Sequence, residues 1–262
     1  MARIDCSKLV TPTRDRVKAA CKDFNKAYAI SEKTLEELFN KYRGNDDIHH
    51  VFLKVVALNF LYSTRIVLHS TKIRDVSDVA EHIYKNHKEI DCALDHDPPK
   101  IETIVDAIAS VPVSGKKTRG CFSFATKYCS WHKPKSYAIW DSNVKVYLRC
   151  LQTTGFRADF KVDGDWKYPM FHGVMADLVK CYDLGELTLK DIDKFLWMEG
   201  ERLKNSGDGG VLDSNYRPGG GDRSGNRQPA TGGVPSHCSV VLRTRAEPMG
   251  GTTGYRLRLW QA

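Results

Sequence analysis

Asp141 stands where an extended stretch ends and a helical pattern begins, within the run Lys127 to Leu148 (KYCSWHKPKSYAIWDSNVKVYL). Before Asp141 the sequence passes through His-Lys-Pro, which stops one helix, and after it come apolar residues at helical spacing. An Asp at a helix N-terminus accepts hydrogen bonds from free backbone N–H groups and faces the positive end of the helix dipole. Helix capping is therefore the first role that the pattern predicts for this carboxylate.

A second set of residues with chemical potential precedes this run, in the short stretch Val111 to Thr118 (VPVSGKKT). Backbone N–H groups of a turn that contains Gly115 can approach a phosphate closely, because no side chain obstructs them. Lys116, Lys117 and Arg119 add positive charge beside that turn. We expect these residues to bind a phosphate backbone without reading its sequence, and an ordinary interhelix turn with solvated lysines is the alternative.

The elements that position these residues are all predicted to be helices, with no convincing strand among residues 1–204. Several begin with capping signals, such as Ser31 and the box-like pair Thr188 and Asp191. The sequence predicts one all-α domain of about eight helices. Their expected ranges are Ser31–Tyr42, Asp46–Tyr62 (a central buried helix), Val76–Asn86, Pro99–Ser110, Thr118–Trp131, Asn143–Gln152, Pro169–Tyr182 and Thr188–Leu203.

Composition sets limits on the class of protein. The 262 residues are 41% hydrophobic and 27% charged, which is ordinary for a globular protein, and the net charge of +8 with a pI near 9.0 suits a polyanionic partner. No apolar run is long enough to cross a bilayer and the N-terminus lacks a signal-peptide core, so we expect an intracellular, cytoplasmic monomer with no membrane partner. In a bacterium it would be nucleoid-associated.

Eight cysteines are spread along the chain without a Cys-x-x-Cys pair, so no zinc or iron–sulfur site is predicted and no cofactor is expected. We expect reduced thiols, mostly buried. His49, His50 and His69 have no partner ligands at metal spacing and are interpreted as structural or surface residues.

The composition changes abruptly after residue 204. All 23 lysines precede this point, whereas 12 of the 20 glycines follow it. A glycine-rich stretch with few apolar residues cannot offset the conformational entropy lost on folding. We therefore expect a helical domain at residues 1–204 and a disordered Gly/Arg-rich tail at residues 205–262, which differs enough in composition to suggest another origin, such as a shifted reading frame.

The order hairpin, helix, Pro turn, extended return and Asp resembles the helix-hairpin-helix DNA glycosylase superfamily. The run is closest to bacterial proteins similar to the 8-oxoguanine glycosylase fold, through Ser123–Pro134 (SFATKYCSWHKP) and Tyr137–Ser142 (YAIWDS). More loosely, the likeness extends to Leu58–Arg65 (LNFLYSTR), which resembles the helix end that borders DNA in this superfamily, and to Ile192–Trp197 (IDKFLW). The hairpin departs from the usual pattern at Val113 and Ser114.

This resemblance implies a DNA repair glycosylase acting on damaged bases in double-stranded DNA, with oxidised purines as one substrate class. Asp141 would stabilise the positive charge that develops on the sugar as the base of a flipped nucleotide departs. Arg65 and Thr64 would contact the DNA, although the end of a buried helix is an equal alternative. A non-catalytic nucleic-acid-binding module of the same fold is the alternative function.

Bifunctional members of this superfamily carry a lysine that attacks the sugar to form a Schiff base. An extended return of seven residues from Pro134 spans roughly 23 Å, and a helix of matching length needs about 13 to 15 residues. The helix that ends at His132 should then begin near residues 118 to 120. This places Lys117 at its DNA-facing end and ahead of Lys127, which lies two to three turns up. Neither lysine has the usual spacing to Asp141, although the spacing of 14 residues from Lys127 to Asp141 would fit a shorter, bent arrangement. Both lysines stay candidates, and a monofunctional glycosylase that uses Asp141 and water is the alternative.

Aromatic residues surround these candidates, and a base-stacking role competes with a place in the core. An aromatic-rich pair of packed segments is more often part of a core. The core interpretation is therefore preferred for the set Phe122, Phe124, Tyr128, Trp131, Tyr137 and Trp140.

Overall fold

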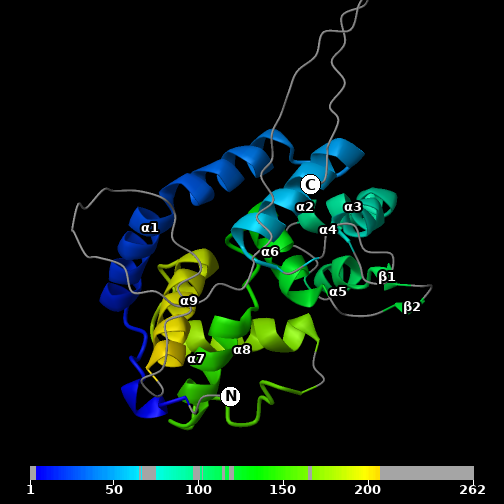
Figure 1. Cartoon of the computed structure of the whole chain (residues 1–262). Coiled ribbons are helices and arrows are strands. Elements are labelled where there is room, and N and C mark those ends of the chain that lie inside the picture. The colour runs from blue at the N-terminus through cyan, green and yellow to red at the C-terminus, as the bar shows by residue number, and fades with distance from the viewer. Residues whose placement is uncertain are drawn as a thin grey trace, which may run out of the picture. The chain divides into compact units, whose positions relative to one another are not determined.

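The part of the chain that the structure describes is an assembly of helices (Figure 1), seen in a computed structural model. It comprises residues 4–64, 66, 75–96, 101, 103–113, 116–117, 121–164 and 167–206. Within these residues there are nine α-helices, one 3₁₀ turn and a pair of two-residue antiparallel strands. The prediction of an all-α fold is confirmed.

The elements follow one another along the chain in the following order. They are η1 (Cys6–Lys8), α1 (Arg14–Lys41), α2 (Ile48–Leu61), α3 (Val76–Lys85), α4 (His87–Asp95), α5 (Ile104–Ala109), β1 (Pro112–Val113), β2 (Lys116–Lys117), α6 (Phe122–His132), α7 (Ser142–Gln152), α8 (Tyr168–Cys181) and α9 (Leu189–Asn205).

Helix α9 packs against both α1 and α7 and so joins the first and last thirds of the described chain (Figure 1). Gly200 lies where α9 crosses α7, and a Cβ added there would be 2.0 Å from the backbone oxygen of Asn143. Only a residue without a side chain permits this approach. The close crossing fixes α9 against the start of α7, where Asp141 caps the helix.

Two predicted helix starts have different outcomes. Thr188 and Asp191 form the expected capping box at the start of α9, with hydrogen bonds in both directions. The predicted start at Ser31 is wrong, because α1 spans Arg14–Lys41 as two helical segments joined at a kink at Tyr28, and Ser31 lies inside the second segment. Serine is tolerated within a helix when packing holds the segment together.

Three other expectations need correction. The helix expected from Thr118 begins at Phe122, with Cys121 as its N-cap residue, and residues 118–120 lie outside the described part. The α5 helix starts at Ile104 and is much shorter than the range predicted from Pro99, and α4 was not predicted. The α2 helix is only half buried, since its exposed face carries Phe52, Leu53 and Phe60.

The chain divides into two units, Met1–Leu212 and Asp213–Ala262, and every described residue belongs to the first. The predicted tail at residues 205–262 falls outside the described residues apart from Asn205 and Ser206. Among the helices that the structure describes, none combines the length and apolarity that crossing a bilayer requires.

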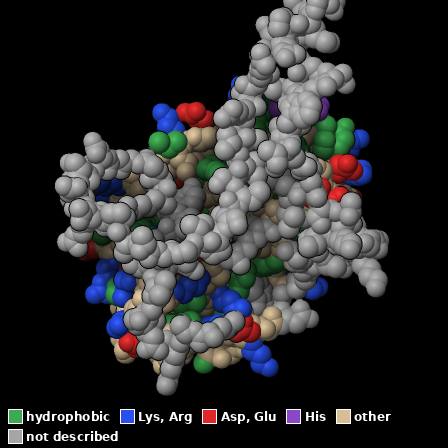
Figure 2. All heavy atoms as spheres, viewed as in Figure 1, with side chains coloured by type: hydrophobic (Ala, Val, Ile, Leu, Met, Phe, Trp, Pro, Cys, Tyr) green, Lys and Arg blue, Asp and Glu red, His purple; other side chains and the backbone are tan. Residues whose placement is uncertain are grey.

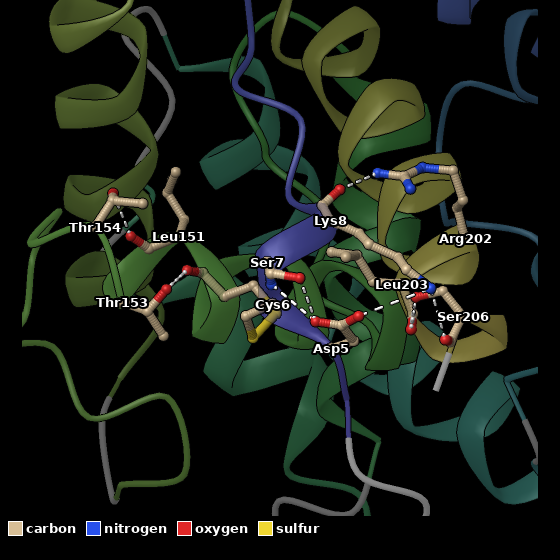
Figure 3. Close-up of a disulfide and its surroundings, with 11 residues drawn as sticks. Asp5, Cys6, Ser7, Lys8, Leu151, Thr153, Thr154, Arg202, Leu203 and Ser206 are labelled. Atoms are coloured by element: carbon tan, nitrogen blue, oxygen red, sulfur yellow. Dashed lines mark hydrogen bonds and ion pairs between the residues drawn. A yellow bond between two sulfur atoms is a disulfide. The ribbon is translucent and has the colours of Figure 1, made fainter. Parts of the chain in front are cut away.

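Cys6 of η1 and Cys150 of α7 form a disulfide, with Cα atoms 4.9 Å apart (Figure 3). The expectation that all cysteines are reduced is therefore wrong for this pair, which is separated by 144 positions and could not be matched from sequence spacing. Around it, the guanidinium of Arg202 donates to the Lys8 backbone oxygen and Lys8 Nζ donates to the Ser206 backbone oxygen (Figure 3). These contacts fasten the N-terminal segment to the end of α9.

The remaining cysteines of the described part are outside the disulfide and differ in exposure. Cys121 and Cys129 are buried, whereas Cys92 and Cys181 are exposed, so the expectation of mostly buried thiols holds only in part.

Candidate functional site

Asp141 is the N-cap residue of α7, as predicted. Its Oδ1 accepts hydrogen bonds from the backbone N–H groups of Asn143 at 2.8 Å and Val144 at 3.0 Å. The extended return that delivers it is tied to α6, because the Trp140 N–H donates to the Thr126 hydroxyl at 3.1 Å. Asp141 is thereby held beside the middle of α6.

Lys127 lies on α6 opposite this carboxylate, with Nζ 3.9 Å from Asp141 Oδ2. The two side chains are 4% and 12% exposed, so the pair is almost closed off from solvent. Lys127 Nζ also donates to the Ser123 hydroxyl at 2.8 Å. Burial lowers the pKa of Lys127, and the opposing charges of Asp141 and Asp193 offset only part of this effect.

Asp193 of α9 adds a second carboxyl group to this cluster. It is buried, and its Oδ1 has no hydrogen-bond partner among the described residues. Burial and the charge of Asp141 raise its pKa well above the usual value, against the lowering effects of Lys127 and Lys190. Asp193 therefore holds its proton more tightly than an ordinary aspartic acid.

A second ionic cluster lies where α1 meets α9. Glu32 Oε2 is 3.3 Å from Lys190 Nζ and 3.2 Å from Lys194 Nζ, and Glu32 Oε1 accepts a hydrogen bond from the Tyr62 hydroxyl at 2.7 Å. Burial raises the pKa of Glu32, but Lys190, Tyr62 and Lys194 outweigh it and the net pKa is lowered. Glu32 is thus an ionised carboxylate shared by two lysines.

These lysines lie in a cleft with a volume of about 560 Å³, formed by α1, α9 and the end of α6. Lys190 Nζ lies over the ring of Trp131, 2.9 Å from its centroid, and Lys194 Nζ donates to Asn25 Oδ1 at 2.7 Å. Burial lowers the pKa of Lys190 to about 8, with Glu32 opposing and Lys194 adding to the effect. The remaining lining residues are Ala29, Lys33, Glu36, Asn40, His132 and Pro134.

The structure brings together only some of the predicted site residues. Lys127 and Asp141 are in contact, whereas Lys116 and Lys117 form β2 of the hairpin and are described by their backbone alone. Arg65, Gly115 and Arg119 lie outside the described residues.

Thr64 follows the end of α2 in a turn organised by Asn59. Its hydroxyl donates to Asn59 Oδ1 at 2.8 Å, and the Ile66 N–H donates to the same oxygen at 2.9 Å. The preceding Ser63 has a φ of 47°. Thr64 thus has a structural hydrogen bond, and its predicted contact with DNA stays a prediction.

The position of Lys127 differs from the one predicted. Because α6 begins at Phe122, Lys127 lies in its second turn and not two to three turns up. The expectation assumed a helix as long as the extended return, but the return from Lys133 folds first through a turn in which the Ser136 N–H donates to the Lys133 oxygen. Because α6 is shorter than expected, Lys127 lies beside Asp141.

Glu32, Lys190 and Lys194 were not predicted as site residues. The spacing of Lys190 and Lys194 places them on one face of a helix, which is an available signal, but solvated lysines share this pattern. Their partner Glu32 lies on α1, which is far from α9 in the sequence, and no pattern in the residues around Glu32 predicts the contact.

The aromatic residues near the pair belong to the core, as expected. Phe124, Tyr128, Trp131 and Tyr137 are buried, and Phe122 and Trp140 are partly buried against them. His50 stacks on Tyr42, and within the described residues no group of His, Cys, Asp and Glu could hold a metal ion. His69 lies outside the described part.

Basic side chains are also present away from the hairpin. Figure 2 shows Lys and Arg gathered over the region where Figure 1 places α7 and α9, with acidic side chains among them. The visible surface there is therefore of mixed charge.

Part of the chain is similar in sequence to known proteins. Residues 15–136 match the family model HI_0787_N, described as an N-terminal domain, a match that includes Lys127 and ends before Asp141. An uncharacterized protein of Haemophilus influenzae is 30% identical over 136 residues, covering 52% of this chain and 62% of that protein. The chain thus spans less than two thirds of the relative's length. No solved structure matches the chain.

Proposed function

We propose that the chain is a DNA repair glycosylase for damaged bases, with Lys127 as the attacking amine and Asp141 as the charge-stabilising carboxylate. The observation that carries the proposal is the 3.9 Å approach of Lys127 Nζ to Asp141 Oδ2 in a nearly buried setting. An amine with a lowered pKa beside an anion is the pairing that nucleophilic attack on a sugar requires.

The reaction begins with the neutral amine. Lys127 Nζ forms a bond to C1′ while the C1′–N bond to the base breaks, the electron pair of that bond leaves with the base, and the base takes one of the two protons on Nζ. Asp141 Oδ2 stabilises the positive charge on the sugar during this exchange. The C1′–O4′ bond then opens, the proton on Nζ passes to O4′, and a Schiff base remains.

Burial of Lys127 supports its role as nucleophile and also sets a requirement. Desolvation favours the neutral amine, which is the reactive form. Side chains 4% and 12% exposed do not admit a nucleotide, so binding of DNA must displace the residues that cover the pair. A site that opens to admit a flipped base and then closes around it keeps water from the reaction.

This assignment reverses the order expected from spacing, which put Lys117 first. Lys117 lies on the hairpin strand β2, and the proposal gives it a DNA-backbone role together with Gly115, Lys116 and Arg119. Thr64 and Arg65 would contact the same duplex from the end of α2. Binding through phosphates should weaken steeply with salt, and Lys116→Ala with Lys117→Ala should reduce the salt slope.

A non-catalytic nucleic-acid-binding module remains the second candidate, because each member of the pair also has a structural partner. Asp141 caps α7 and Lys127 donates to Ser123, so each residue has a structural role that requires no catalysis. Under this alternative the wild-type chain binds duplex DNA and releases no base.

The deciding experiment uses duplexes that each contain one lesion, 8-oxoguanine first, and follows base release with and without hot alkali. Base release should be abolished by Asp141→Asn and by Lys127→Gln. Borohydride should trap a covalent DNA adduct in the wild type and in Lys117→Ala, but not in Lys127→Gln.

Lys133→Gln is the matched control, because Lys133 follows α6 and its one ion pair within the described residues is with the exposed Asp95 at 3.3 Å. Base release without an adduct would assign water as nucleophile and remove the amine role of Lys127. Release unaffected by Asp141→Asn would reject the mechanism, and wild-type inactivity across a broad lesion panel would favour the binding module.

A further inference from the structure

The cleft between α1 and α9 has an ionic floor that the proposed reaction does not use. Its inner charges are Glu32, Lys190 and Lys194, whose side chains are 14%, 14% and 11% exposed. These are low values for lysines, which are seldom buried unless paired. A largely desolvated group of charges inside a cavity needs its own explanation.

The charges of this floor do not balance. One carboxylate serves two ammonium groups, and no second acid lies within 4.0 Å of Lys190 or Lys194 in the described part of the chain. Asp193 also influences Lys190, but it lies beyond the 4.0 Å of an ion pair with either lysine. Two ammonium groups therefore share one carboxylate within contact distance, in a site where compensation is worth more than in water.

The two ammonium groups are also held in place. Trp131 lies under Lys190, and Asn25 accepts a hydrogen bond from Lys194. Glu32 is itself fixed by the Tyr62 hydroxyl. Because each ammonium has three N–H groups, Lys190 and Lys194 retain donors that these contacts do not use. Preorganised donors with excess positive charge favour an anionic ligand.

We propose that this cleft binds a small organic acid, whose carboxylate bridges Lys190 and Lys194. A carboxylate carries the single negative charge that the floor lacks and can accept one hydrogen bond from each ammonium. The volume of about 560 Å³ is in the range of small-molecule sites, and Ala29, Trp131 and Pro134 supply apolar wall for the rest of the ligand. The site is independent of the Lys127–Asp141 reaction.

The test titrates the full chain with benzoate and follows backbone and indole N–H signals by NMR, with benzamide as the neutral ligand of the same shape. Benzoate should shift the Trp131 indole signal, whereas benzamide should not. Lys190→Gln and Lys194→Gln should each weaken benzoate binding about tenfold, as loss of one charge-assisted hydrogen bond requires.

Three further variants separate the cleft charges from other charges. Glu32→Gln keeps an acceptor for Tyr62 but removes the competing anion, so it should strengthen benzoate binding several-fold. Lys33→Gln removes a charge from the cleft rim, where the Lys33 side chain is 77% exposed, and should change affinity less than twofold. Asp141→Asn should leave benzoate binding intact, which separates this site from the proposed reaction.

Several outcomes would overturn the proposal. These are no benzoate-dependent shift at Trp131, equal binding of benzamide, or wild-type affinity in both Lys190→Gln and Lys194→Gln. A variant that fails to fold shows no dispersed spectrum, and the conclusion then rests on the other lysine variant and on the benzamide comparison.

Discussion

Asp141 divides its two carboxylate oxygens between different neighbours, and Lys127 is one of them. Oδ1 accepts the Asn143 and Val144 N–H groups, while Oδ2 lies 3.9 Å from Lys127 Nζ. Capping and charge pairing therefore do not compete for the same atom. A single residue can hold the start of α7 and present an anion to α6.

This division predicts separable effects of substitution. Asp141→Asn keeps a capping oxygen but leaves Lys127 without its partner, and loss of one member of a buried pair costs about 3 kcal/mol or more in unfolding free energy. Adding Lys127→Met removes the stranded charge, so the double variant should recover much of the loss. Urea unfolding of the four chains in a double-mutant cycle measures the coupling. Additive effects would mean that the pair contributes nothing.

The helix caps near this site could be predicted from the sequence, because caps and helix periodicity depend on residues that are neighbours in the chain. Asp141 and Thr188 both cap helices where predicted. The contact between Lys127 and Asp141 was expected only as the second-ranked arrangement, since it depends on α6 starting at Phe122 and on a turn after Lys133. Nothing in the sequence at residues 118–120 indicates that the helix starts later than Thr118.

Contacts between distant segments could not be predicted at all. Glu32 meets Lys190 and Cys6 meets Cys150 only because α1, α7 and α9 pack together. A single sequence records such packing only as apolar periodicity, which fixes the buried face of a helix but not its partner.

The carboxylate site in the cleft should depend on pH. Lys190 has a pKa of about 8 because burial lowers it, with Glu32 raising it, Lys194 lowering it and Asp193 raising it. The charged form of Lys190 binds an anion and the neutral form does not, so benzoate affinity should be full below pH 8 and fall as pH rises through it. Isothermal titration between pH 6 and pH 10 tests this.

Lys190→Gln supplies the control for that titration. Without the titrating amine, the remaining affinity should be nearly flat across the same window. A wild-type affinity that is constant from pH 7 to pH 9 would contradict the assignment of Lys190 to the site.

The crossing of α9 over α7 predicts contrasting effects at two glycines. In Gly200→Ala the new Cβ would lie 2.0 Å from the Asn143 oxygen, so backbone must move and the unfolding free energy should fall by about 3 kcal/mol or more. In Gly173→Ala on α8 the Cβ meets nothing within 4 Å, and higher helix propensity should stabilise by up to about 1 kcal/mol. Thermal unfolding of both variants compares them directly.

The disulfide predicts a redox-dependent stability. Cys6 and Cys150 close a loop with a sequence separation of 144, for which loop-closure entropy gives about 5 kcal/mol and measured disulfides typically give about 2–4 kcal/mol. Cys6→Ser should therefore lower the unfolding free energy by about 2 kcal/mol or more, and reductant should then have little further effect. Cys92→Ser, at an exposed free thiol, is the control. Equal stability of wild type with and without reductant would contradict a structural role for this bond.

The end of the helical domain is tested by truncation. The predicted boundary at residue 204 falls inside the last turn of α9, and Lys8 Nζ donates to the Ser206 oxygen beyond it at 3.1 Å. A chain ending at residue 206 should unfold cooperatively with the stability of the full chain, and one ending at residue 204 should lose about 1 kcal/mol with this exposed contact and the frayed helix end.

A chain ending at residue 201 should fare much worse, because it also loses Arg202, which holds the Lys8 backbone, and Leu203, which is fully buried. Removing a buried leucine side chain alone costs about 2–5 kcal/mol. Circular dichroism during urea unfolding ranks the three chains. If the chain ending at residue 206 aggregates or loses its transition, residues 207–262 contribute to the folded domain, and the boundary predicted from composition is wrong.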